Sequence, residues 1–195
     1  RGEIQAVIGQ NGAGKSTMIN VISGMLSPDA GEIRLAGQSV TMDSTRAAIA
    51  EGIATVYQEL SLLPNLTIAE NIALGREPRH GGLLDRAAMR AKAATALARM
   101  GLDLSPDARV SDLSLAERQL VEIAKALSHG PSVLVLDEPT AALGSQETER
   151  LFAVLKALRA EGISIIYVSH RFREILDICD RATVLRNGRV VRTTE

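Results

Sequence analysis

The fold is decided by the stretch Gly9-Gln10-Asn11-Gly12-Ala13-Gly14-Lys15-Ser16-Thr17. It satisfies the phosphate-loop pattern G-x-x-x-x-G-K-[ST], with an apolar segment at 4–8 before it and a helical pattern at 16–25 after it. The alternative is an ordinary glycine-rich turn, but the pattern arises by chance in well under about 1% of chains of this length. The sequence therefore predicts a P-loop (residues 9–17) between a buried strand and a helix.

The chemistry of this loop lies mainly in its backbone. The three glycines let the chain curl so that successive N–H groups face one point, and the following helix adds its unpaired N–H groups. Lys15 is predicted to reach the β- and γ-phosphates, Ser16 to hold Mg²⁺, and Thr17 to lie on the α-phosphate side. We therefore expect residues 9–17 to bind a nucleoside triphosphate; the pattern does not indicate which base.

Composition narrows the choice of partners. With 22 basic and 23 acidic residues and only 2% aromatics, the chain lacks the basic charge and stacking groups typical of nucleic-acid binding. The single cysteine, Cys179, excludes an internal disulfide, and no apolar run approaches the length of a membrane span. His80 and His129 belong to no motif and are predicted to lie on the surface. The chain starts at Arg1 almost directly with a strand, so we expect an N-terminally truncated fragment.

Strands and helices alternate as in an α/β domain with a mostly parallel sheet. Strands are predicted at 4–8, 32–35, 53–57, 133–137, 163–169 and 182–186, and helices at 16–25, 44–51, 146–161 and 171–178. Asn187-Gly188 predicts a hairpin after the last of these strands.

The middle of the chain has helical periodicity only. Thr67 with Glu70 and Ser114 with Glu117 fit capping boxes, a longer helix is expected at 85–100, and a loop at 80–82. We therefore predict one domain over 1–195, with an α/β core of 1–66 and 130–195 and a helical subdomain at 67–129.

Four apolar residues, 133–136, lead into the acidic pair Asp137-Glu138. In α/β folds the end of such a strand lies beside the P-loop, so Asp137 is predicted to hold Mg²⁺ and Glu138 to act as the general base for the attacking water. The alternative is an exposed acidic turn. The P-loop upstream favours the catalytic interpretation.

Further short motifs occur in a fixed order along the chain. They are Gln58 after a strand, Ser114-Leu115-Ala116-Glu117 before a helix, Asp137-Glu138, Ala141-Ala142-Leu143-Gly144, and His170 after a strand. In this order the whole chain resembles the ATP-binding-cassette (ABC) ATPases. The resemblance implies a P-loop core with a mostly parallel sheet, antiparallel β elements and an inserted helical subdomain. It also implies that Gln58 is a Mg²⁺ or water ligand, that His170 contacts the γ-phosphate, and that Ser114–Glu117 form a signature loop serving the nucleotide of a partner cassette.

Three segments, 57–66, 119–127 and 180–186, are similar to the sugar-importer branch of that family. This resemblance implies an ATPase that binds ATP and Mg²⁺ and whose ATP hydrolysis drives uptake of a monosaccharide of the ribose, xylose or galactose type. It implies a second cassette fused in the same full-length chain, transmembrane permease subunits, and a periplasmic or extracellular sugar-binding protein, with no nucleic acid. It places the protein peripherally at the cytoplasmic face of the plasma membrane.

The chain departs from the family pattern in the signature loop and at position 144. Leu115 and Ala116 stand where the family usually carries glycines, and apolar residues there are familiar in the sugar-importer branch. Glu117 stands where the family carries glutamine, and it would either repel the partner's triphosphate or cap its own helix. Gly144 replaces a common aspartate, and the adenine-stacking aromatic is expected to precede residue 1. Two alternatives stay open: a soluble cassette ATPase without a membrane partner, and a non-hydrolysing nucleotide sensor. The intact Lys15, Asp137, Glu138 and His170 argue against the sensor, whereas Glu117 and Gly144 keep it open.

Overall fold

The computed structural model describes residues 2–194, which form two compact units. The first contains the chain up to Thr55, Pro131–Glu138, and the chain from Leu158 onward; the second contains Val56–Gly130 and Pro139–Ala157. The second unit is thus larger than the 67–129 segment expected to be the helical subdomain. Periodicity alone did not indicate that the flanking segments pack with those helices.

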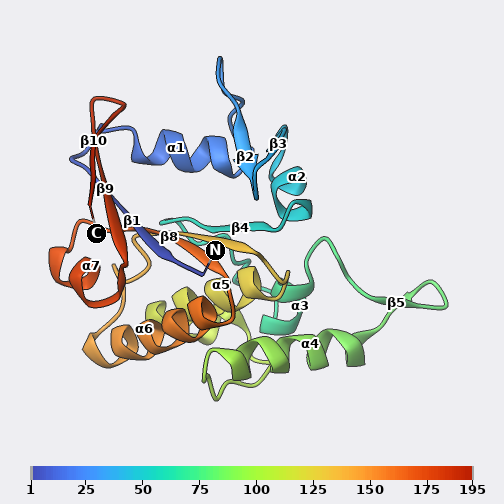
Figure 1. The fold of residues 1–195 in the computed structure, drawn as a ribbon. Coiled ribbons are helices and arrows are strands. Elements are labelled where there is room, and N and C mark those ends of the chain that lie inside the picture. The colour runs from blue at the N-terminus through green and yellow to red at the C-terminus, as the bar shows by residue number, and fades with distance from the viewer. Residues whose placement is uncertain (1, 195) are drawn as a thin grey trace. The chain divides into compact units, whose positions relative to one another are not determined.

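The first unit is built on a six-stranded sheet in the order β10-β9-β1-β8-β7-β4 (Figure 1). The strands are β1 (Ile4–Ile8), β4 (Ile53–Val56), β7 (Val133–Asp137), β8 (Ser164–Val168), β9 (Arg181–Arg186) and β10 (Arg189–Thr194). Pairing is parallel for β1 with β8, β1 with β9 and β7 with β8, and antiparallel for β9 with β10. The predicted hairpin forms at Asn187 and Gly188, both with positive φ (50° and 71°), as a type I′ turn requires. The expected mostly parallel α/β sheet is confirmed.

The register of three strands positions the functional site. Val7 on β1 and Asp137 on β7 both pair with Val168 on β8, so the three residues form one row across the sheet. Strands lie about 4.8 Å apart, which separates Val7 from Asp137 by about 10 Å. Since the strands are parallel, the residues that follow them, including Gly9 and His170, emerge at the same edge.

The three helices wholly within this unit are α1 (Lys15–Ile22), α2 (Thr45–Ala50) and α7 (Phe172–Ile178). Helix α1 ends three residues before the predicted Met25. The N–H of Gly24 bonds to Val21 O (3.2 Å) and that of Met25 to Asn20 O (2.9 Å), while Gly24 takes a φ of 72°. This Schellman termination stops the helix, because a left-handed residue cannot continue it.

A separate hairpin joins β2 (Ile33–Leu35) to β3 (Gln38–Val40). Its turn residues, Ala36 and Gly37, both have positive φ (51° and 84°), the conformation of a type I′ turn. The sequence indicated only the first strand, because alanine at the first turn position carries no turn signal.

The second unit is mainly helical, with α3 (Ile68–Ala73), α4 (Arg86–Arg99), α5 (Leu115–Leu127) and α6 (Ser145–Ala160). The part of α6 up to Ala157 belongs to this unit. Helices α3, α4 and α5 pack on one another. Both predicted capping boxes are formed. The predicted loop at 80–82 is instead the turn of a small hairpin, β5 (Arg79–His80) with β6 (Leu83–Leu84), too short to give a periodic pattern. Between residues 2 and 194, no helix is both long and apolar enough to cross a bilayer.

Candidate functional site

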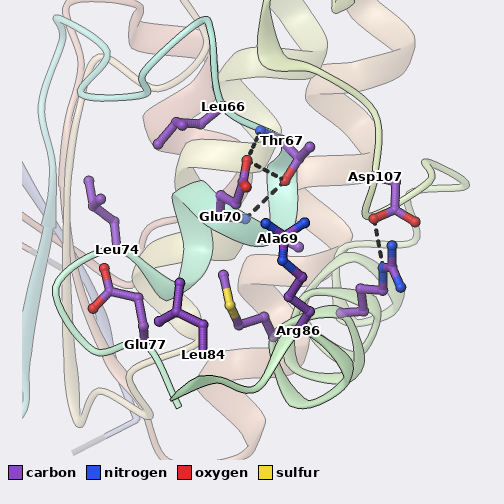
Figure 2. Close-up of a pocket in the computed structure, with 11 residues that line it drawn as sticks. Leu66, Thr67, Ala69, Glu70, Leu74, Glu77, Leu84, Arg86 and Asp107 are labelled. Carbon is purple, nitrogen blue, oxygen red and sulfur yellow. Dashed lines mark hydrogen bonds and ion pairs between the residues drawn. The ribbon is translucent and has the colours of Figure 1, made fainter. Parts of the chain in front are cut away.

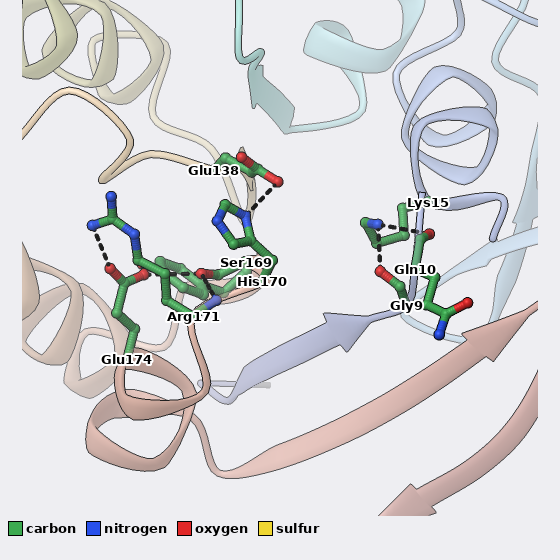
Figure 3. A network of polar contacts seen from close by, with 9 residues as sticks. Gly9, Gln10, Lys15, Glu138, Ser169, His170, Arg171 and Glu174 are labelled. Atoms are coloured by element: carbon green, nitrogen blue, oxygen red, sulfur yellow. Dashed lines mark hydrogen bonds and ion pairs between the residues drawn. The ribbon is translucent and has the colours of Figure 1, made fainter. Parts of the chain in front are cut away.

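The P-loop follows β1 and leads directly into α1. Its turn is closed by the N–H of Ala13 bonding to Gln10 O (3.0 Å), and Gly12 and Gly14 take φ values of 79° and 103°. Lys15 donates from Nζ to Gly9 O (2.6 Å) and Gln10 O (3.2 Å), as Figure 3 shows. The loop therefore holds its own lysine over its backbone carbonyls.

Close packing explains one of the loop's glycines. A Cβ on Gly9 would lie 2.7 Å from both Leu185 O and Ala13 Cβ, so any side chain would force the loop and β9 apart. Gly12, by contrast, has open space around it and needs glycine only for its backbone angle. Glycine is thus required at these two positions for different physical reasons.

The residues of the loop fit a phosphate group. The ammonium of Lys15 has three donors, of which two bond to the loop, and the first turn of α1 leaves its N–H groups without helical partners. Gly14 caps that helix and has no side chain to occupy these groups. Beside the loop, a cavity of about 670 Å³ is lined by residues that include Gln10, Asn11 and His170. An anion bound by the loop would meet N–H donors and the positive charge of Lys15, and Arg186 lines the adjoining cavity.

Asp137 ends β7 at the same edge of the sheet. Burial raises the pKa of Asp137, and the neighbouring Glu138 carboxylate raises it further, whereas the positive charge of Lys15 opposes the shift. That opposing effect identifies Lys15 as an electrostatic neighbour of Asp137. A cation bound near Asp137 would stabilise its ionised form.

Glu138 and His170 face each other. Nδ1 of His170 lies 2.9 Å from Oε1 of Glu138, and the imidazole is 64% exposed against 21% for the glutamate side chain (Figure 3). Because an ionised carboxylate only accepts hydrogen bonds, Nδ1–H is the donor. Glu138 has a φ of 48° and its N–H bonds to Val168 O (2.9 Å). This left-handed residue at the strand end is a strained conformation of the kind found at functional sites.

The structure divides the predicted site residues between the two units. Residues 9–17, Asp137, Glu138 and His170 belong to the first unit, whereas Gln58 and Ser114–Glu117 belong to the second. Gln58 is exposed and lies two residues after the end of β4.

Ser114 is the N-cap of α5. The Glu117 carboxylate accepts from both the backbone N–H and the hydroxyl of Ser114 (2.8 Å each), and Glu117 N–H bonds to Ser114 Oγ (3.2 Å). Of the two alternatives for Glu117, this geometry favours helix capping. Leu115 projects into solvent with 59% exposure, next to the half-buried Ala116.

The second unit also holds a smaller cavity of about 200 Å³, between α3 and α4 (Figure 2). Figure 2 shows the capping box of Thr67 and Glu70 at its wall, with Leu74 and Leu84 beside it. Hydrogen bonds from Thr67 lower the pKa of Glu70. None of the predicted site residues lines this cavity.

Sequence reasoning missed a buried acid behind His170. Glu174 lies four residues after His170, on α7, and is 7% exposed; its carboxylate bonds to Tyr167, Ser169 and Arg171. The available signal was a glutamate one helical turn beyond the histidine. The prediction of a surface position is wrong for His129, which is half-buried, and burial lowers the pKa of His129 to about 4.

A magnesium ion would need ligands of a particular kind here. In the described part of the chain, no group of three or more His, Cys, Asp or Glu side chains is arranged to hold a metal. Ser16 at the start of α1 and the half-buried Asp137 supply a hydroxyl and a carboxylate oxygen, which suits a hard cation that takes its other ligands from water and phosphate.

The sequence profile of the family described as "ABC transporter" matches residues 1–141. The chain belongs to this family. The resemblance predicted from the ordered motifs is therefore confirmed.

Relatives extend the match over nearly the whole chain. The ribose import ATP-binding protein RbsA 1 of Streptomyces avermitilis is 50% identical over 191 residues, which are 98% of this chain and 37% of the relative. The putative ribose/galactose/methyl galactoside import ATP-binding protein 3 of Burkholderia cenocepacia is 49% identical over 195 residues, or 100% and 38%. The chain thus spans well under half the length of these relatives.

Solved structures agree on the fold. A nucleotide-free ATP-binding cassette from an ABC transporter has a TM-score of 0.88 and 27% identity, covering 100% of this chain and 81% of the other. A dimeric cassette bound to ADP and Pi has a TM-score of 0.83 and 29% identity, covering 100% and 85%. The predicted fold class, an ABC ATPase core, is confirmed.

Proposed function

We propose that this chain is the ATP-binding and ATP-hydrolysing cassette of an importer that uses ATP to take up a monosaccharide of the ribose, xylose or galactose type. The observation that carries the proposal is the shared sheet edge. Strands β1, β8 and β7 deliver the P-loop, His170 and the pair Asp137-Glu138 to one side of one unit. The names of the relatives, which are import proteins for ribose and galactose, support the substrate class.

In this proposal the protein acts by positioning groups and by moving one proton. Lys15 and the N–H groups of residues 9–17 bind the triphosphate and stabilise charge that develops on the γ-phosphoryl group. Glu138 accepts a proton from water as the water oxygen bonds to the γ-phosphorus. The bond from that phosphorus to the bridging oxygen breaks, and ADP and phosphate are the products. His170, bonded to Glu138, stands beside the reacting group.

Magnesium would be held by Ser16 and Asp137 and would neutralise charge on the β- and γ-phosphate oxygens. Asp137 fits this role because burial already disfavours its ionised form in the protein alone. Its carboxylate therefore gains from a neighbouring cation.

The proposed site is completed by a second cassette. The signature loop Ser114–Glu117 would serve the nucleotide of that partner, and the partner's loop would serve the nucleotide at Lys15. The lengths of the relatives support fusion of the two cassettes in one chain. We further propose permease subunits and an external sugar-binding protein as partners, with the cassettes on the cytoplasmic side of the membrane.

Hydrolysis is tested in the full-length transporter with Glu138→Gln. We expect nucleotide binding to persist while kcat falls by more than about 100-fold, since the general base is lost. Lys15→Ala should instead weaken binding of labelled ATP. Glu51→Gln, which makes the same charge change at an exposed helix end, is the matched control and should leave both quantities unchanged. Normal hydrolysis by Glu138→Gln would show that the assigned base is wrong.

The substrate class is tested by uptake. Reconstituted vesicles with the transporter and its binding protein should accumulate radiolabelled ribose, xylose or galactose only with ATP inside the compartment that holds the cassettes. The Glu138→Gln transporter should not accumulate sugar. Uptake of none of these sugars, with ATP hydrolysis intact, would refute the monosaccharide proposal and leave the ATPase proposal standing.

A further inference from the structure

Glu174 is a buried carboxylate beneath the segment that carries His170. It is 7% exposed, although it lies on α7 only one turn beyond the exposed histidine. Burying a carboxylate is costly unless hydrogen bonds compensate. Oε2 of Glu174 accepts from the hydroxyls of Tyr167 (2.8 Å) and Ser169 (3.0 Å), and Oε1 accepts from the guanidinium of Arg171 (3.2 Å).

Ser169 links the Glu174 carboxylate to the backbone next to His170. Its hydroxyl donates to Glu174 and at the same time accepts from the backbone N–H of Arg171 (3.0 Å), as Figure 3 shows. The residues on both sides of His170 are therefore tied to one buried carboxylate. The side chain of His170, by contrast, is 64% exposed, and its ring contacts Glu138.

We propose that Glu174 is a positioning residue, which fixes the backbone on either side of His170 and thereby directs the imidazole toward Glu138. The inference rests on the proposed ATPase function. An exposed ring on a free loop would sample many orientations, whereas catalysis needs its groups held in one geometry before reaction. The carboxylate supplies that order without touching the nucleotide or the reacting atoms.

The chain offers a matched pair of variants that separates positioning from general stability. Ser169→Ala and Tyr167→Phe each remove one hydroxyl that donates to Oε2 of Glu174. Only the first also breaks the bond to Arg171 N–H and releases the His170 segment. A purely structural role for Glu174 predicts similar effects of the two variants on activity. A positioning role predicts an effect of Ser169→Ala alone.

The experiment measures steady-state ATP hydrolysis by the full-length transporter. We expect Ser169→Ala to lower kcat by about 10-fold with KM within about twofold, and Tyr167→Phe to keep both within about twofold. Glu174→Gln should retain most of kcat, because its amide oxygen still accepts from both hydroxyls and, of these three bonds, only the one from Arg171 to the other carboxylate oxygen is lost. Unchanged kcat in Ser169→Ala, or an equal loss in Tyr167→Phe, would overturn the inference.

A double variant tests whether the effect passes through His170. In a His170→Ala background the ring to be positioned is absent, so adding Ser169→Ala should cause no further loss of kcat. Losses that multiply would overturn the inference, because Ser169 would then act independently of the ring. Glu138→Gln is measured alongside: normal hydrolysis by that variant refutes the proposed function itself, whereas its expected loss leaves the Ser169 result to decide on Glu174 alone.

Discussion

The signature loop offers a prediction in which structure and function can be separated. In Ser114→Ala the hydroxyl bonds to Glu117 are lost, one donated to its carboxylate (2.8 Å) and one accepted from its N–H (3.2 Å). The bond from Ser114 N–H to the carboxylate (2.8 Å) survives. Loss of an N-cap hydroxyl costs about 1 kcal/mol of unfolding free energy. For a chain of 195 residues this corresponds to a Tm lower by about 2–4 °C.

The second capping box is the control. On α3, Thr67 and Glu70 make the same three bonds, at 2.9, 3.1 and 3.2 Å, so Thr67→Ala should cost a similar amount of stability. Both variants are followed by thermal unfolding and by ATP hydrolysis in the full-length transporter. Because only Ser114 is proposed to serve the partner's nucleotide, we expect Ser114→Ala to lower kcat by about 10-fold or more and Thr67→Ala by less than about twofold. Equal losses of activity would refute the role of Ser114 in the composite site and leave it as a helix cap.

Two further predictions concern the first unit. Gly24→Ala should lower the free energy of unfolding in urea by about 3 kcal/mol, since its Cβ would lie 2.4 Å from Ser44 O and its φ is 72°. Gly31→Ala is the control: its φ is 91° but the space around it is open, so it should cost about 1–2 kcal/mol. Equal losses would show that the contact with Ser44 is easily relieved. Burial raises the pKa of Asp137 above its ordinary 3.8, so the folded protein favours the protonated carboxyl. The contribution of this group to folding stability is therefore fully present below pH 3.8 and is lost as the pH rises through the raised pKa. Asp137→Asn should therefore raise the unfolding midpoint at pH 7, lose that advantage below about pH 4, and abolish hydrolysis; a lower midpoint at pH 7 would contradict this.

The sequence was sufficient to predict the features that depend on neighbouring residues. The P-loop, both capping boxes and the turn at Asn187-Gly188 were predicted because each depends on residues a few positions apart. Strands β1 and β7 were predicted with their observed bounds, since each is a short apolar run with a clear end. Short-range hydrogen bonding and backbone preference decide such features before any tertiary packing forms.

The tertiary structure decided how these parts combine. Strand β8 lies between β1 and β7, so Val7 pairs with Val168, far along the chain, and the 2.9 Å contact of Glu138 with His170 joins residues 32 positions apart. The burial of Glu174 likewise depends on tertiary contacts, including the hydrogen bond from Tyr167 on β8, and a helix of seven residues is too short for its periodicity to indicate it.

The sequence by itself therefore determined the P-loop, the order of the motifs and the family. Only the tertiary structure decided that Glu138 and His170 meet and that the buried Glu174 lies behind His170. The physical reason is range: a phosphate-binding loop is made by consecutive backbone N–H groups, whereas the geometry of Glu138 and His170 exists only where two parallel strands end side by side.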